Sequence, residues 1–386
     1  MKKNTLNAYN IADLRELARR RVPKGIFEAI DRGSEDEVAL RNNRQAFERI
    51  KLKPRRLVNV SNRSQAITLF GQKQKMPIVV APTGTTGQMW YQGEIALALA
   101  AAAAGIPFTL SNAATSAMEQ VVERGGGNPW FQLYMVPDRS MSYRVVERAR
   151  VAGFEALVVT VDSMISTNRE FSIRNGFTMP FTFNFTNMID VLMHPRWLLG
   201  VMVRYLLTTG MPRYENYPSE LISSITSRKA GQLMTKNETL EWDDLRALRK
   251  LWPRTLIVKG ILDPQDAILA ADCGADAVIV SNHGGIVFDS AMAPIEVLPA
   301  VVDAVGSRIP VLVDSGFRRG SDVVKALALG AKAVMIGRAT LYGTAAAGEV
   351  GAARAIALLR QEIDRSLAQL GCPDINALDR TYVAQH

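Results

Sequence analysis

Short apolar runs recur between Pro77 and Arg338 and alternate with alanine-rich segments of helical character. The runs are apolar enough to be buried on both faces, as is typical of parallel strands covered by helices. Eight strands alternating with helices predict a (β/α)8 TIM barrel, and an open doubly wound sheet is the alternative. We expect one barrel domain to span residues 1–386. The runs are Ile78–Ala81, Phe108–Ser111, Trp130–Tyr134, Leu157–Val161, Leu256–Lys259, Ala277–Ser281, Val311–Asp314 and Ala333–Gly337.

The last two runs both end beside glycine and arginine. Gly316 and Arg318 follow one run, and Gly337 and Arg338 end the other. Glycine lets backbone N–H groups approach an anion, and arginine donates paired hydrogen bonds to it. Surface arginines on an ordinary βαβ unit are the alternative. Because a phosphate site commonly follows strands seven and eight of such barrels, this pattern predicts a phosphate cradle and favours the barrel over the open sheet.

The composition limits which partners, metals and compartments we expect. The net charge of +9 indicates an anionic partner, but no nucleic-acid motif is present, so we expect no nucleic-acid binding. Two cysteines, Cys273 and Cys372, form neither a disulfide framework nor a metal-ligand pattern, so we predict no metal site and a reducing compartment. No apolar run reaches the roughly 18 residues that span a bilayer.

Two regions do not follow the alternation of strands and helices. Residues 1–63 predict three short helices and a basic connection, with Asn10 capping one helix and Ser34-Glu-Asp-Glu37 forming a capping box for the third. Between strands four and five, roughly ninety residues intervene, and loops of that length are usually functional. We treat residues 181–245 as the insertion.

Within the insertion, residues 188–211 predict an amphipathic helix. Trp197, Leu198, Val201, Met202, Tyr205 and Leu206 recur at helical spacing beside arginines. Such a face can lie in a membrane interface, but a lid or an oligomer contact would use the same face.

Polar side chains end several of the apolar runs and should therefore gather at the active-site rim of a barrel. His283 is the candidate general base, and Asp162 is the candidate that stabilises its protonated form. Lys259 should be buried and so demands an anionic partner. Tyr134 and Arg169 could serve the substrate or be structural.

The motifs resemble the FMN-dependent α-hydroxy acid dehydrogenase and oxidase family over about residues 8–380. The specific signatures are Ser281-Asn-His-Gly-Gly followed by Asp289, and the stretch Asp-Ser-Gly-Phe-Arg-Arg-Gly-Ser-Asp at 314–322. Its mandelate dehydrogenase branch looks nearest, through Pro82-Thr-Gly84, His194-Pro-Arg-Trp197 and Gly337-Arg-Ala-Thr-Leu-Tyr-Gly343.

The resemblance implies FMN across the barrel mouth. Gly316, Arg318, Gly337 and Arg338 would hold its phosphate, with Asp314 near the ribityl chain and Lys259 beside the flavin N1 and O2. His283, with Asp162 behind it, would take a substrate proton as two electrons pass to FMN, and Tyr134 and Arg169 would face the substrate. The remaining cofactor contacts would be Pro82, Thr83, Gly84, Ser111, Gln132, Thr160 and Ser281.

The resemblance also implies the setting of the enzyme. Membrane-bound relatives dock through the loop after strand four, so residues 188–211 would contact a membrane and a quinone would accept the electrons. We expect a homotetramer that is cytoplasmic or peripheral on the inner face of the cytoplasmic membrane.

Two departures stand where the family holds the substrate carboxylate. Ile286 replaces the family's arginine, and Ala29 replaces a tyrosine. Losing the arginine removes a charge-assisted pair of hydrogen bonds. We therefore predict an apolar or aromatic alcohol or amine-type substrate in place of a simple 2-hydroxy acid. The alternatives are a mandelate- or lactate-like (S)-2-hydroxy acid dehydrogenase that feeds a membrane quinone, and a flavin-binding partner without catalysis.

Overall fold

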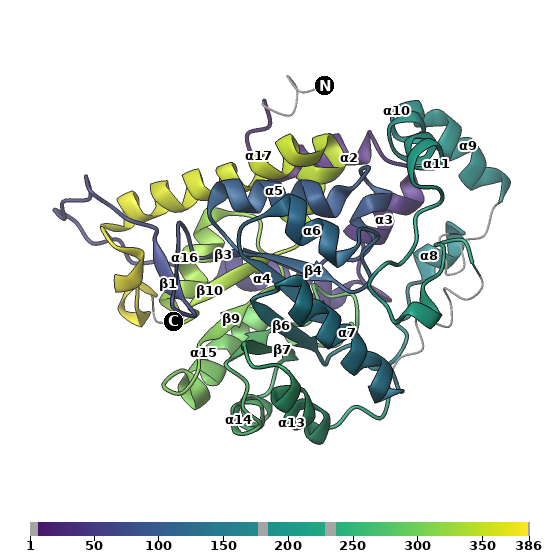
Figure 1. Cartoon of the computed structure of the whole chain (residues 1–386). Helices are drawn as coiled ribbons and strands as arrows, with labels where there is room; N and C mark the ends of the chain where they lie inside the picture. Colours follow the sequence, from purple (N-terminus) through teal and green to yellow (C-terminus); the bar gives the residue numbers. More distant parts are fainter. Residues whose placement is uncertain (1–6, 177–183, 228–236, 385–386) are drawn as a thin grey trace.

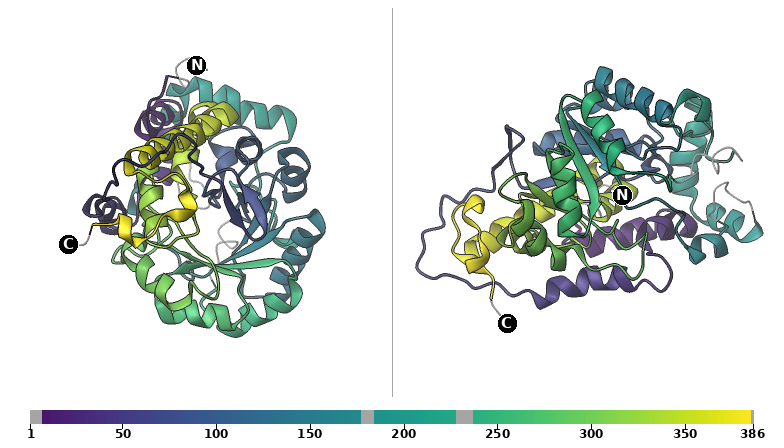
Figure 2. Two further views of the ribbon diagram at one scale, coloured as in Figure 1. Left: turned by 90° about the vertical axis from the view of Figure 1, so that its left-hand side faces the viewer. Right: turned by 90° about the horizontal axis from the view of Figure 1, so that it is seen from below.

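The computed structural model describes residues 7–176, 184–227 and 237–384, so parts of the predicted 181–245 insertion lie outside the described residues. A closed parallel barrel of eight strands forms the centre, in the order β10-β3-β4-β5-β6-β7-β8-β9 (Figures 1 and 2). The predicted barrel is confirmed, and the open sheet is excluded. The strands are β3 (Ile78–Val80), β4 (Phe108–Ser111), β5 (Pro129–Leu133), β6 (Ala156–Thr160), β7 (Thr255–Ile261), β8 (Ala277–Val280), β9 (Val311–Val313) and β10 (Ala333–Ile336).

Helices cover the outside of the barrel, and the strands are therefore buried on both faces. All five residues of β6 are buried, for example, so neither face of this strand meets solvent. The last helix, α17, kinks at Ala347 and Gly348, where Gly348 has φ +61° against the ring of Trp90. The surrounding helices are α5 (Gly93–Ala104), α6 (Met118–Gly125), α7 (Arg139–Ala152), α13 (Trp242–Leu251), α14 (Pro264–Asp272), α15 (Pro294–Val305), α16 (Gly320–Ala328) and α17 (Arg338–Leu370).

Three helices precede the barrel, as predicted: α2 (Ile11–Arg19), α3 (Lys24–Asp31) and α4 (Val38–Arg49). Asn10 caps α2 by accepting from the Asp13 N–H at 2.8 Å. The predicted capping box of the third helix is wrong. Glu37 precedes α4 in a left-handed conformation, and its carboxylate binds Arg32 and the Gly33 N–H instead of capping.

The two ends of the barrel carry different additions (Figure 1). A short antiparallel pair, β1 (Ile67–Leu69) and β2 (Gln72–Gln74), lies at one end. At the opposite end, beyond the carboxyl ends of the barrel strands, lie α8 (Glu170–Arg174), α9 (Phe185–Met193), α10 (Pro195–Trp197) and α11 (Arg204–Thr208).

The predicted amphipathic helix over 188–211 is broken, and half of the face expected to meet a membrane is buried: Trp197, Val201 and Tyr205 point inward, whereas Leu206 is exposed. Pro195 begins α10, and one π-helical turn (Leu198–Val203) joins α10 to α11. Trp197, Val201 and Tyr205 are 4%, 0% and 5% exposed, and the Trp197 indole N–H donates to the Gln88 carbonyl at 2.7 Å. The apolar side chains that do face outward are Phe185, Met188, Ile189, Leu192, Met193, Leu199, Leu206 and Leu207.

Candidate active site

The carboxyl ends of the barrel strands open into one cavity of about 1350 Å³, which α3 and the α8–α11 region help to enclose. The structure brings most of the predicted site residues to its wall. Gln132, Asp162 and Ser281 are not on the wall but bind residues that are. The predicted residues on the wall are Ala29, Pro82, Thr83, Gly84, Ser111, Tyr134, Thr160, Arg169, Lys259, His283, Ile286, Asp314, Gly316, Arg318, Gly337 and Arg338.

His283 and Asp162 form a hydrogen-bonded pair at the rim. His283 follows β8, and its Nδ1 lies 2.8 Å from Asp162 Oδ1 beyond β6. This bond orients the ring and favours a proton on Nδ1, which leaves Nε2 as the basic atom. Nε2 lies 3.2 Å from the Tyr134 hydroxyl. The arrangement suits a general base whose protonated form is stabilised by a carboxylate.

Left-handed backbone conformations and a close packing contact hold His283 at the rim. His283 itself has φ +56°, and its N–H donates to Ser281 Oγ at 3.0 Å. Gly285 has φ +73°, and a Cβ there would lie 2.6 Å from the backbone nitrogen of Leu40. The loop after β8 therefore packs directly on the start of α4, which requires glycine.

Lys259 forms the buried cation of the site. Its Nζ lies 3.2 Å from Asp314 and 3.9 Å from Asp162, and it donates to Ser281 Oγ at 2.8 Å. Burial disfavours its charge, but the carboxylates of Asp314 and Asp162 outweigh burial and raise the pKa of Lys259. Burial likewise opposes the charge of Asp162, but His283 and Lys259 lower the pKa of that carboxyl. The two groups are therefore held as ions.

Three buried polar atoms at the ends of β5 and β6 have no hydrogen-bond partner in the described part of the chain: Gln132 Nε2, Thr160 Oγ1 and Asp162 Oδ2. Gln132 is oriented by Ser111, whose hydroxyl donates to Gln132 Oε1 at 2.8 Å. Buried polar groups are normally bonded, so these atoms predict a ligand with polar atoms along its edge. A flavin ring edge fits this set, together with the cation of Lys259.

The predicted phosphate cradle is only partly as expected. Gly316 has φ +86°, and a Cβ there would lie 2.4 Å from the Asn43 carbonyl oxygen, so its backbone needs glycine. The Arg338 guanidinium, however, donates to three backbone carbonyls: Ile30 at 2.6 Å, Gly284 at 2.7 Å and Arg32 at 3.0 Å. The Arg338 side chain thus ties the end of α3 to the rim. Phosphate binding by Gly316, Arg318, Gly337 and Arg338 stays a prediction.

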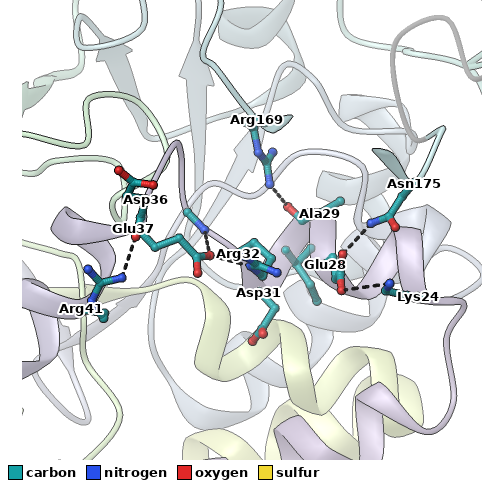
Figure 3. Close-up of polar contacts among 12 residues, drawn as sticks. Lys24, Glu28, Ala29, Asp31, Arg32, Asp36, Glu37, Arg41, Arg169 and Asn175 are labelled. Atoms are coloured by element: carbon teal, nitrogen blue, oxygen red, sulfur yellow. Dashed lines mark hydrogen bonds and ion pairs between the residues drawn. The ribbon is translucent and has the colours of Figure 1, made fainter. Parts of the chain in front are cut away.

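The substrate side of the cavity is less polar. Arg169 Nη2 donates to the Ala29 carbonyl at 2.5 Å, at the C-terminal end of α3 (Figure 3). Burial, with a smaller effect of Arg338, lowers the pKa of Arg169 to about 10, so the group is still charged at neutral pH. Its Nε is buried without a partner, and it forms no ion pair within the described residues. The guanidinium also lies over the Phe171 ring, 5.2 Å from its centroid. A half-buried cation with a free N–H on a cavity wall predicts an anionic ligand.

Sequence reasoning missed the residues that fix the His283 loop. The amides of Asn43 and Asn282 bind each other through two hydrogen bonds of 2.9 and 2.8 Å. Ser315 Oγ accepts from the Gly284 N–H at 3.0 Å and donates to Asp314 at 2.8 Å. Asn43 and Asn282 stand far apart in the sequence, so no local pattern predicts their pairing.

Comparisons with known proteins agree with this geometry. The family model described as FMN-dependent dehydrogenase matches residues 18–385. An (S)-mandelate dehydrogenase of Pseudomonas putida is 44% identical over 377 residues, covering 98% of this chain and 94% of that protein. An L-lactate oxidase of Nostoc sp. is 38% identical and covers 97% of both chains. A crystal structure described as the monotopic membrane protein (S)-mandelate dehydrogenase superposes with a TM-score of 0.93 at 43% identity, covering 98% and 100% of the two chains.

Proposed function

The chain belongs to the FMN-dependent dehydrogenase family, and from that premise we propose that it oxidises a 2-hydroxy acid of the mandelate or lactate type. The observation that carries this proposal is the half-buried guanidinium of Arg169, whose Nε is buried without a partner and which lines the same cavity as His283. A substrate carboxylate would satisfy Arg169 and would bring the neighbouring hydroxyl-bearing carbon towards His283.

The chain's own residues account for binding and proton transfer. His283 Nε2 takes the substrate proton, and Asp162 stabilises the imidazolium that results. The Tyr134 hydroxyl, beside Nε2, can hydrogen-bond the substrate oxygen, because burial raises its pKa and keeps it protonated. Bound FMN supplies the acceptor for the two electrons. Gln132, Thr160 and Lys259 would hold its ring, with Lys259 supplying positive charge.

An uncharged alcohol or an amine is the second candidate substrate, and it is the one that the sequence alone favours. Ile286 and Ala29 favour it because neither side chain can bind a carboxylate. The named relatives, a mandelate dehydrogenase and a lactate oxidase, favour the acid. The assembled His283–Asp162 pair speaks against a flavin-binding protein without catalysis.

Anaerobic stopped-flow reduction of the bound flavin tests the proposal. We would compare (S)-mandelate and L-lactate with mandelamide, methyl mandelate and benzylamine, in wild type, Ile286→Arg and the control Ile286→Leu. We expect the acids to reduce the wild-type flavin, and Ile286→Arg to lower their Kd further. Reduction by the uncharged compounds alone would favour the second candidate. Reduction by none of them would favour the non-catalytic reading.

We also propose that the enzyme binds a membrane peripherally through α9–α11 and passes electrons to a quinone. No helix in the described ranges is long and apolar enough to cross a bilayer. The outward apolar side chains include Phe185 and Leu207, each 80% exposed, and one solved relative is described as monotopic. Residues 188–211 contribute most of this face. The homotetramer and the location at the inner face of the cytoplasmic membrane stay predictions.

Flotation with anionic phospholipid vesicles tests the membrane proposal. Leu207→Glu should weaken flotation, because it places a negative charge in the apolar interface against an anionic surface. Val151→Glu on α7 is the matched control, since Val151 is also highly exposed, at 73%, but lies outside α9–α11. Equal flotation of both variants and wild type would contradict the assignment of this face.

A further inference from the structure

The cavity has an apolar branch that the reaction chemistry leaves unexplained. It extends from Ala29 and Ile286, on the wall that also contains His283, to residues of α3 and the α9–α11 region. The apolar side chains that line this part include Ile26, Val191, Leu198, Met202 and Leu206. An arginine at position 286 or a tyrosine at position 29 would place a polar group where the branch begins, and the chain has neither.

The branch reaches the apolar surface already described. Met188, Leu192 and Leu206 line the cavity, yet they are 53%, 67% and 55% exposed. The same side chains therefore face both the interior and the outside, which is expected where a cavity opens. The opening lies on the face that we propose to contact a membrane.

Hydrogen bonds join the helices that form the walls of the branch, and the carboxylates that accept them are paired. The Lys24 N–H donates to the Asp190 carboxylate at 2.6 Å, which joins the start of α3 to α9. Asn175 donates to Glu28 at 2.5 Å, which joins α3 to the end of α8 (Figure 3). Asp190 is the acidic residue of α9 on the cavity wall, and its carboxylate is bound by the Lys24 N–H and lies 3.3 Å from His194 Nδ1.

The cavity has to hold FMN as well as the substrate, in a volume of about 1350 Å³. FMN would lie beside Lys259 and Asp314, whereas the apolar branch is lined by α3 and the α9–α11 region. An apolar branch of this kind favours a ligand with an apolar tail, because each buried methylene improves the affinity about fourfold.

We infer that this branch receives the apolar tail of an amphiphilic 2-hydroxy acid with about six carbons or more, supplied from a lipid surface. The inference rests on the proposed function. The carboxylate binds Arg169, the hydroxyl-bearing carbon faces His283, and the tail runs past Ala29 and Ile286 towards α9 and α11. The reaction is the one proposed above: conversion of the carbinol to a 2-oxo acid removes two electrons and two protons, of which His283 takes one proton and bound FMN would take the two electrons with the other proton.

A chain-length series tests the inference in the reductive half-reaction, which needs no electron acceptor. L-Lactate, 2-hydroxybutyrate, 2-hydroxyhexanoate and 2-hydroxyoctanoate would be mixed anaerobically with the FMN-loaded enzyme. We expect the ratio of the reduction rate to Kd to rise by at least about a hundredfold from lactate to 2-hydroxyoctanoate, since five methylenes are added. A flat or falling series would overturn the inference while leaving the proposed function intact. Failure of every acid would overturn the proposed function itself.

A matched pair of variants on α9 locates the effect. Val191→Trp narrows the branch, whereas Ile189→Trp adds the same bulk on the outer side, because Ile189 does not line the cavity and is 45% exposed. We expect Val191→Trp to reduce the advantage of 2-hydroxyoctanoate over lactate at least tenfold, and Ile189→Trp to leave it unchanged.

The alternative occupant of the branch is the acceptor. If Val191→Trp preserves the chain-length advantage but slows reoxidation of the reduced flavin by a short-chain quinone, the branch serves the acceptor and the inference is wrong. Flavin content and the melting temperature report whether each variant folds. Should Val191→Trp lose FMN, the wild-type series alone decides.

Discussion

The two sides of the active-site cavity are built differently. On the reaction side, His283, Asp162, Lys259 and Asp314 each bind at least one other ionisable group of this set, and Ser281 binds two of them. On the substrate side, Arg169 binds one backbone carbonyl, and Ala29 and Ile286 have apolar side chains.

The reaction side of the cavity determines the chemistry, and the substrate side determines which molecule binds. Buried ions that hold one another cannot be replaced singly without leaving an uncompensated charge, so the reaction side tolerates little change. Apolar wall residues are constrained mainly by volume, so a change of Ala29 or Ile286 alters which molecules fit while the reaction stays the same. Variants on the two sides should therefore fail in different ways.

The largest effect should come from the base. His283→Gln should slow flavin reduction by about 10²–10⁴-fold, which is the usual contribution of general base catalysis. FMN should remain bound, because the orphaned atoms of Gln132 and Thr160 are unchanged. Rapid-mixing kinetics with mandelate measures the rate, and His194→Gln is the control because His194 lies outside the rim. An unchanged rate would remove His283 from its role.

Removing the buried cation should damage the fold as well as the chemistry. Lys259→Met leaves the carboxylates of Asp162 and Asp314 buried without their shared cation, and breaking a buried pair in this way costs about 3–5 kcal/mol of unfolding free energy. Urea denaturation of the FMN-bound protein measures this loss. Lys332→Met, on an exposed lysine, should cost close to nothing. Similar stability of both variants would contradict the ionic character of the site.

Arg169 sharpens the comparison, because it is the charged group of the substrate side. Arg169→Met should raise the Kd for mandelate by about 10- to 100-fold, as expected for loss of a hydrogen bond to a charged group. The Kd for mandelamide should change much less. Stopped-flow titration with both ligands gives the two ratios, and equal losses would indicate that Arg169 acts through structure and not through charge.

The smallest effect concerns acid pH. Because the folded pKa of Asp162 lies below the ordinary value, its ionised form stabilises the fold at neutral pH, and this contribution is lost as the pH falls through the folded pKa. The melting-temperature advantage of wild type over Asp162→Asn should therefore stay constant from about pH 7 to about pH 4 and shrink as the pH falls below about 4. A constant advantage below about pH 4 would show that the carboxylate contributes no pH-linked stability.

The sequence alone determined the barrel and most of the site. Each strand is a local apolar run, and the closed parallel order brings all run endings to one rim. The gathering of His283, Lys259, Asp314 and Tyr134 at that rim therefore follows from the order of the runs and the residues that end them. The glycine requirement at Gly316 was likewise visible in its motif. Periodicity also indicated an apolar segment at 188–211.

Only the tertiary structure decided which atoms each of these side chains contacts. The Arg338 side chain, predicted to bind the phosphate, also donates to carbonyls of the α3 region, more than 300 positions earlier in the chain. Trp197, expected on the outer face, is buried against the Gln88 segment, so other side chains form the exposed apolar surface. Both outcomes depend on backbone atoms distant in the sequence. Local patterns specify which side chains can bind or pack, but the partner that satisfies each of them is set when remote segments meet.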